Sequence, residues 1–380
     1  MQHVTRPHES WDAEIATVRV LYGAGRLSEL GKVVRGHGGR RALLVSDPGL
    51  RAAGHVDAAL ARLAEAGVET RLFDEVGSNP TEADVESGAA FARSGGEPPE
   101  ILVALGGGSA MDAAKGINFL LTNDGPMERF WGFGKAERPL LPAVAVPTTA
   151  GTGSDAQSYA LISRSDSGRK MACGDRSARF RTALLDPERA NTAPRAGDAA
   201  AGIDALAHAV ESFVTRVRTP VSSMLAREAW TLLGSSLESA LAGGGVPVYG
   251  RLLLGAHLAG AAIEASMLGG AHAAANPLTA RHGILHGVAV GMMLPAVVRH
   301  NSAVADDLYA RLVPGGGAAL ARRLEELGKI AGLPPSLAAL GLERGDLPAL
   351  ARAATDEWTG GYNPSPLSEG DFLKLYEQVL

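Results

Sequence analysis

The sequence predicts two unlike halves: an α/β half with a doubly wound, mostly parallel Rossmann-like sheet, followed by an all-α half. At 380 residues the chain is too long for one compact core and fits two domains of ordinary size. The first half alternates short apolar runs with helical stretches, whereas the second half carries helical periodicity. We place the change near residues 187–196 and assign 1–190 to the α/β domain and 191–380 to the helical domain.

Strands and helices alternate along the first half. Strands are expected at 16–23, 41–47, 70–76 and 100–108, and again from 142, where a polar loop follows up to 154. Helices are expected between them, at 25–38, 58–68, 80–96 and 109–123. The strands are apolar at successive positions, so both faces of the sheet should be covered, as in a parallel doubly wound sheet.

Helical periodicity dominates the second half. Helical stretches are expected at 194–215, 221–241, 251–275, 286–301, 318–332, 347–358 and 369–380. The glycine-rich segments 242–250 and 314–318 are expected to be surface loops between helices.

Composition argues against several classes of protein. The net charge is −5 and no run of Lys or Arg occurs, so we expect no nucleic acid or anionic membrane partner. A single cysteine, Cys173, excludes an internal disulfide framework and a Cys-rich zinc site. The polar N-terminus has no secretory pattern, and no stretch reaches the roughly 18 uninterrupted apolar residues of a membrane span. We therefore expect a cytoplasmic enzyme.

A glycine-rich turn is the first candidate site. The segment 102–116 places Gly107, Gly108 and Ser109 between a buried strand and a helix, where backbone N–H groups could approach a diphosphate. A tight turn that needs glycine only for its backbone is the alternative. Asp47 ends the second strand and could bind the ribose hydroxyls of a dinucleotide, or it could simply begin an Asp-Pro turn.

A carboxylate and three imidazoles form the second candidate site. Asp204 and His208 are four residues apart on a predicted helix, so they share one face, as metal ligands or as an ordinary buried pair. His272 and His286 lie in an apolar, small-residue segment that suits uncompensated polar groups poorly. A straight helix would separate these two by about 21 Å. A common metal therefore requires a chain reversal, at Asn276-Pro277 or at His282-Gly283.

These residues belong to an ordered set of motifs that resembles the iron-containing, group III alcohol dehydrogenases. The resemblance runs from about Tyr22 to the C-terminus. Its landmarks are LLVSDPGL (43–50), GSNPT (77–81), LGGGSAMDAAKG (105–116), VPTTAGTGSD (146–155), RKMACGD (169–175), LLDPE (184–188), GIDALAHAVE (202–211), His272, HGVAVGMMLP (286–295) and WTGGYNP (358–364). It implies a dehydroquinate synthase-like architecture and hydride transfer between a nicotinamide and a small aldehyde or its alcohol.

The resemblance also implies roles for particular residues. The metal ligands would be Asp204, His208, His272 and His286, a set that suits Fe²⁺ or Zn²⁺. The dinucleotide, NAD or alternatively NADP, would contact Asp47, Asn79, Gly107, Gly108, Ser109, Thr148, Thr149 and Lys170, with Asp112 and Thr152 in the same site. Many family members carry a histidine near the nicotinamide where this chain has Asn276, which cannot titrate near neutral pH. We therefore name His282 as the substitute proton donor.

Other functions fit the same architecture. The substrate could be a small anionic aldehyde, such as a phosphonate or carboxylate semialdehyde. A dehydroquinate synthase-type lyase would need many basic residues around a phosphorylated substrate, whereas the second half here is rich in Ala and Gly. A dinucleotide-sensing protein without turnover would not need the Asp and His set. We expect a homodimer with a small-molecule substrate.

Overall fold

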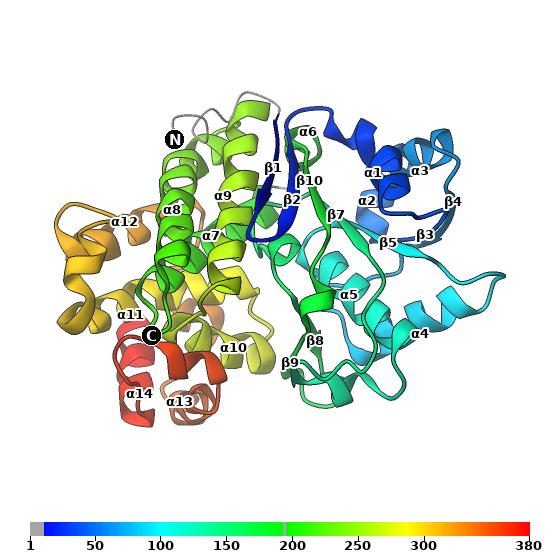
Figure 1. Ribbon diagram of the computed structural model, residues 1–380. Coiled ribbons are helices and arrows are strands. Elements are labelled where there is room, and N and C mark those ends of the chain that lie inside the picture. The colour runs from blue at the N-terminus through cyan, green and yellow to red at the C-terminus, as the bar shows by residue number, and fades with distance from the viewer. Residues whose placement is uncertain (1–10, 193–194) are drawn as a thin grey trace. The chain divides into compact units, whose positions relative to one another are not determined.

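The computed structural model describes residues 11–192 and 195–380. The chain divides into two compact units, Met1–Ala193 and Pro194–Leu380. The first is an α/β unit and the second is entirely helical in its described part (Figure 1). The predicted fold class is therefore confirmed.

A seven-stranded sheet forms the centre of the α/β unit. Its strands, in spatial order, are β1 (Trp11–Ile15), β2 (Val18–Tyr22), β10 (Thr182–Leu185), β7 (Ala143–Pro147), β5 (Ile101–Gly106), β3 (Arg41–Val45) and β4 (Glu69–Phe73). All neighbours pair in parallel except β1, which runs antiparallel to β2 at the edge. The predicted strands begin and end within a few residues of these bounds, because the apolar runs are the buried strands themselves.

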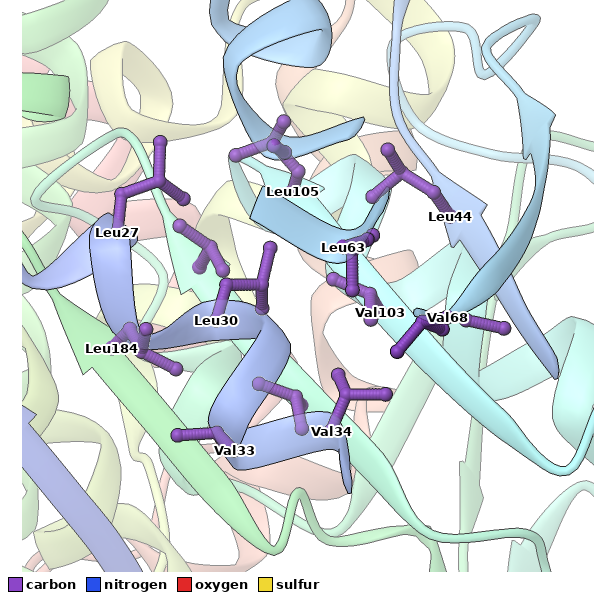
Figure 2. Packing of buried hydrophobic residues seen from close by; sticks show 14 of the residues in the cluster. Leu27, Leu30, Val33, Val34, Leu44, Leu63, Val68, Val103, Leu105 and Leu184 are labelled. Atoms are coloured by element: carbon purple, nitrogen blue, oxygen red, sulfur yellow. The ribbon is translucent and has the colours of Figure 1, made fainter. Parts of the chain in front are cut away.

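Helices cover both faces of this sheet. They are α1 (Leu30–Gly36), α2 (Pro48–Ala52), α3 (His55–Glu65), α4 (Glu82–Arg93), α5 (Gly108–Thr122) and α6 (Pro187–Ala190). On one face, Leu30 and Val34 of α1 and Leu63 of α3 pack against Val103 and Leu105 of β5 (Figure 2). The alternate residues of β5, which point to the other face, are buried as well. Burial on both faces explains why the strand is apolar at every position.

A second, smaller sheet was not predicted from the sequence. It contains β6 (Gly132–Phe133), β9 (Lys170–Gly174) and β8 (Tyr159–Ser163), with β8 and β9 antiparallel. The strands have no more than five residues each, and Lys170, Cys173 and Gly174 interrupt any simple apolar pattern. Such short strands are recognised only through their pairing partner.

The described residues of the helical unit form eight α-helices. They are α7 (Arg195–Val214), α8 (Pro220–Leu241), α9 (Val246–Glu264), α10 (Gly270–His282), α11 (His286–Tyr309), α12 (Gly316–Ile330), α13 (Leu347–Thr355) and α14 (Glu369–Val379). The expected stretch 251–275 is in fact two helices, broken between Glu264 and Gly270. The expected loop 242–250 is shorter than predicted, because α9 already begins at Val246, with a proline in its first turn where that residue is favoured.

One of the two predicted chain reversals is wrong. Pro277 lies inside α10 without ending it, whereas Gly283 ends the helix in the left-handed conformation at φ 66°. The proline leaves one intrahelical bond unmade. The neighbouring carbonyl, that of Ala274, accepts a hydrogen bond from the buried Tyr376 hydroxyl of α14, at 2.6 Å. The turn between His272 and His286 is therefore at His282-Gly283.

Two helices, α9 and α11, are long and apolar enough to pass a length and composition test for a membrane span. In each, most of the apolar segment is buried inside the unit, 78% for α9 and 67% for α11. This is how the core helices of a helical unit behave, because they are surrounded by protein on most sides.

Candidate metal and dinucleotide sites

Three adjacent strands of the α/β unit bring the predicted dinucleotide residues to one sheet edge. Asp47 follows β3, the glycine-rich turn follows β5, and Thr148 and Thr149 follow β7. These parallel strands are neighbours, so their carboxyl ends meet. The chain forms β4 between β3 and β5, on the other side of β3, which makes the β3–β5 boundary a topological switch point. Ligands of doubly wound sheets bind at such a point.

Asp47 is the N-cap of α2, with Pro48 at the first helical position, where the alternative interpretation expected an Asp-Pro turn. Its Oδ1 accepts a hydrogen bond from the backbone N–H of Leu50, at 3.0 Å, and so caps α2. No described hydrogen bond engages Oδ2, and the side chain is half-buried. Capping therefore does not prevent the second carboxylate oxygen from accepting a ribose hydroxyl.

The glycine-rich turn packs tightly against the loop that follows β7. A Cβ added to Gly108 would lie 2.5 Å from Thr152 Cγ2, and one added to Gly107 would lie 3.1 Å from Thr149 Oγ1. At the start of α5, Ser109 Oγ accepts a hydrogen bond from the backbone N–H of Asn79, at 3.2 Å. Six predicted dinucleotide residues thus lie together where the N-terminus of α5 offers backbone donors.

Asp112 and Lys170 occupy different settings from the other members of the set. Asp112 is buried, accepts a hydrogen bond from Ser154 Oγ at 2.6 Å, and has its pKa raised by burial. The buried Lys115 ammonium donates to the carbonyl oxygens of Ser154, Gln157 and Tyr159. Asp112 and Lys115 therefore hold the loop after β7 in place, whereas Lys170 is half-buried as the first residue of β9.

Four predicted ligands come together in the helical unit. Asp204 and His208 share one face of α7, His272 lies in the first turn of α10, and His286 begins α11. The Nε2 atoms of His208, His272 and His286 lie 3.5, 3.4 and 3.9 Å from Asp204 Oδ1. The imidazoles of His208 and His272 are stacked with centroids 4.9 Å apart. Asp204, His208 and His272 could each offer one atom to a single cation.

Glu211 determines which nitrogen of His272 faces the cluster. Its two carboxylate oxygens accept from His272 Nδ1 at 2.5 Å and from the Ala271 N–H at 2.6 Å. With its proton on Nδ1, a neutral His272 presents the lone pair of Nε2 to Asp204 Oδ1. Both atoms are buried, and neither has a hydrogen-bond partner among the described residues. Two acceptors facing each other in a buried site call for a cation between them.

The titration behaviour of the cluster agrees with such a site. Burial alone would lower the pKa of His272, but the carboxylates of Glu211 and Asp204 outweigh it and raise that pKa to about 9. Burial alone would raise the pKa of Asp204, yet the three histidines lower it well below its usual range. A proton is therefore held here when no cation is bound, and a metal would displace it.

Sequence reasoning missed Glu211, although a signal was present. Asp204, His208 and Glu211 have the spacing i, i+4 and i+7, which places all three on one face of α7. Burying three ionisable side chains on one face of an otherwise apolar helix costs folding free energy unless they pair with one another or bind a common ligand.

The WTGGYNP segment holds the helices that carry the cluster. Asn363 Oδ1 accepts from the backbone N–H of Gly270, at 3.1 Å, and its amide exchanges hydrogen bonds with Asn301 of α11. The carbonyl of Tyr362 accepts from Thr215 Oγ1, just after α7, at 3.0 Å. One segment thus contacts α10, α11 and the end of α7.

Family models match almost the whole chain. The model of the iron-containing alcohol dehydrogenase matches residues 17–187, and that of the C-terminal region of the Fe-containing alcohol dehydrogenase family matches residues 198–380. The chain belongs to the iron-containing alcohol dehydrogenase family. The predicted family is therefore confirmed, and the two matched regions fall one in each compact unit.

Relatives of this chain are similar to it over nearly their full length. The 1,3-propanediol dehydrogenase of Klebsiella pneumoniae is 32% identical over 374 residues, which cover 94% of this chain and 96% of the relative. The NAD-dependent methanol dehydrogenase of Bacillus methanolicus is 29% identical over 373 residues, covering 95% and 97%. The crystal structure of a 1,3-propanediol oxidoreductase has a TM-score of 0.90 at 31% identity and covers 99% of this chain and 100% of that one.

Asn276 and His282, the two residues considered in connection with the proton donor, lie in different surroundings. Asn276 is one turn beyond His272 on α10, and its side-chain amide donates to Glu357 Oε2 at 2.8 Å. His282 is exposed at the last residue of α10. Among the described residues, no hydrogen bond or ion pair joins His282 to the four predicted ligands.

Proposed function

We propose that this dehydrogenase uses a divalent metal, Fe²⁺ or Zn²⁺, and NAD to interconvert a small aldehyde or ketone and its alcohol. The observation that carries the proposal is the buried pair of acceptors, Asp204 Oδ1 and His272 Nε2, 3.4 Å apart. A cation satisfies both. When bound, the metal would polarise the substrate carbonyl as a Lewis acid and the nicotinamide would supply the hydride. Related dehydrogenases are named for short alcohols, 1,3-propanediol and methanol.

The chain's own residues have separate tasks in this reaction. Glu211 holds the His272 ring so that Nε2 faces Asp204, and the small side chains around His272 on α10 keep water away from the cluster. The glycine-rich turn and the N-terminus of α5 bind the diphosphate, and Asp47 Oδ2 accepts from the ribose. Asn276 cannot deliver a proton, so His282 or solvent completes the alcohol.

The decisive experiment is an aldehyde panel with NADH and NADPH, on protein reconstituted anaerobically with Fe²⁺ or Zn²⁺. The proposal expects stoichiometric oxidation of NADH by at least one short aldehyde, dependent on the added metal. Turnover without net NADH consumption would instead indicate the lyase chemistry of the dehydroquinate synthase type. Tight dinucleotide binding without turnover on any member of the panel would indicate a sensing protein.

Asp47 should control the choice of dinucleotide. A 2′-phosphate would lie against its carboxylate, so the wild type should bind NADH more tightly than NADPH. Asp47→Asn keeps a capping side chain but removes the charge, and should narrow the preference by about tenfold or more. Asp47→Gly should do the same, with only a small loss of helix stability. The measurement is the dissociation constant of each dinucleotide by fluorescence titration.

A wild type that prefers NADPH would show that Asp47 acts only as a helix cap. The same conclusion would follow if Asp47→Asn left both dissociation constants unchanged.

Asn276 should affect how the rate of aldehyde reduction depends on pH. With no histidine at this position, the wild type should lack the fall in rate that accompanies deprotonation of an imidazole. Asn276→His would place an imidazole beside the Glu357 carboxylate, which raises an imidazole pKa above about 6.5. The variant should therefore lose rate as the pH rises through that higher value, in a pH–rate series in which chemistry limits turnover.

His282→Ala is the companion variant in that series. If His282 donates the proton, its removal should lower the rate of reduction. It should also abolish any fall in rate with rising pH that the wild type shows. An unchanged rate and profile would assign the proton to solvent instead.

A further inference from the structure

An open cavity of about 570 Å³ on the surface of the helical unit is lined by four exposed arginines. They are Arg216, Arg218, Arg227 and Arg311. The remaining lining comes from Thr219, Pro220, Ser223 and Met224, at and just inside the start of α8. The cavity contains none of the predicted metal ligands. Its size is in the range of sites that bind small organic molecules.

The four guanidinium groups have no acidic partner. None of the ion pairs among the described residues includes any of them, and no carboxylate lines the cavity. Arginines elsewhere in the chain, such as Arg41, Arg129 and Arg164, pair with glutamates. The whole protein carries a net charge of −5, so a local group of four unneutralised cations is not a consequence of composition. Like charges that line one cavity repel one another, and a bound anion would offset that repulsion.

Neutral partners hold three of these side chains without cancelling their charge. Arg216 donates to the carbonyl of Gly361, and Arg218 donates to the carbonyl of Thr215 at 3.4 Å. The Arg311 guanidinium lies 5.5 Å from the centroid of the Phe213 ring. Because a guanidinium has five N–H donors, each of these contacts leaves donors for a ligand. These three arginines are therefore partly ordered before any ligand arrives.

The N-terminus of α8 adds a smaller contribution. The helix has 22 residues, and the positive end of its dipole lies at the cavity. Most of its first donors are already used, because Ser222 N–H bonds to Thr219 Oγ1 and Ser223 N–H bonds to the Thr219 carbonyl. Anion recognition here depends on the arginines, and the helix only adds to the potential.

We propose that this cavity binds organic compounds bearing two or more phosphate groups. Arginine matches phosphate oxygens with paired hydrogen bonds, and four of them suit several negative charges spread over a few ångströms. Pro220 and Met224 supply an apolar wall for the carbon frame of the ligand. The site is too small and too local for a nucleic acid, and it was invisible in the sequence because Arg311 is far along the chain from the other three.

The test uses the full-length, metal-loaded enzyme and inorganic tripolyphosphate as the probe, titrated by calorimetry. The wild type should bind one equivalent per chain, with an affinity that falls as NaCl is raised. Arg227→Ala should weaken binding by roughly tenfold, and adding Arg311→Ala by a further factor of roughly ten. Arg227→Lys should retain more affinity than Arg227→Ala, because it keeps the charge. Arg322→Ala, an exposed arginine outside the cavity, should bind as the wild type does.

Three results would overturn this proposal. The first is that the wild type does not bind tripolyphosphate. The second is that Arg227→Ala binds tripolyphosphate as tightly as the wild type. The third is that saturating NADH abolishes binding, which would place the anion at the dinucleotide site. Light scattering provides a further check. A change of oligomeric state in Arg227→Ala, without anion binding by the wild type, would make this face a contact between copies of the chain. Metal content measured before and after titration separates chelation from binding.

Discussion

His286→Ala should give a folded protein that has lost most of its bound metal. His286 begins α11, and its Nε2 lies 3.9 Å from Asp204 Oδ1, so alanine removes one of the four proposed ligands without interrupting a helix. Altering an outer partner of a metal ligand already costs about 10- to 100-fold in affinity, and losing a ligand should cost more. We expect metal content to fall to a small fraction of the wild-type value and aldehyde reduction to fall with it.

Mass spectrometric metal analysis of the purified protein is the direct measurement. His300→Ala is the matched control, because it removes a half-buried histidine from the same helix about 21 Å away. Circular dichroism and thermal unfolding report whether both variants are folded. Full metal occupancy in His286→Ala, at the wild-type stoichiometry, would remove His286 from the ligand set.

Sequence patterns predicted the large elements of the fold because burial determines them. The strands β3, β5 and β7 are apolar at almost every position and are bounded by turn residues. Their short length and continuous apolar sequence both indicate buried strands. The short strands β6, β8 and β9 carry no such pattern and depend on pairing between distant segments. Pro277 shows a similar limit in a helix. Local propensity predicts a break at the proline, yet α10 continues through it to His282.

The candidate sites also have parts that local sequence patterns predict and parts that depend on contacts between distant segments. The pair of Asp204 and His208 was predictable because helix geometry alone brings residues four apart together. Nothing in the spacing of His272 shows that α10 brings it to within 3.4 Å of Asp204, so that step needed the family resemblance. The arginine-lined cavity had no sequence signal, because its members come from the segment before α8, from α8 itself and from beyond α11.

Glu211→Gln should weaken the orientation of the metal ligand His272 while the helical unit remains folded. The wild-type carboxylate accepts two hydrogen bonds, from His272 Nδ1 and from the Ala271 N–H. Glutamine has nearly the same shape but only one acceptor oxygen, so its NH₂ group would face one of these donors. Either the His272 ring turns or its proton moves to Nε2, and in both cases the lone pair offered to the metal is lost.

We therefore expect Glu211→Gln to weaken metal binding by about 10- to 100-fold. The enzyme should regain much of its rate when metal is supplied in excess, which a purely structural defect would not allow. Glu228→Gln, a half-buried carboxylate on α8, is the charge-matched control and should keep wild-type affinity. The measurement is a competition titration with a chelator of known affinity, beside thermal unfolding of the metal-free proteins. If Glu211→Gln bound metal as tightly as the wild type, Glu211 would not be the residue that orients His272.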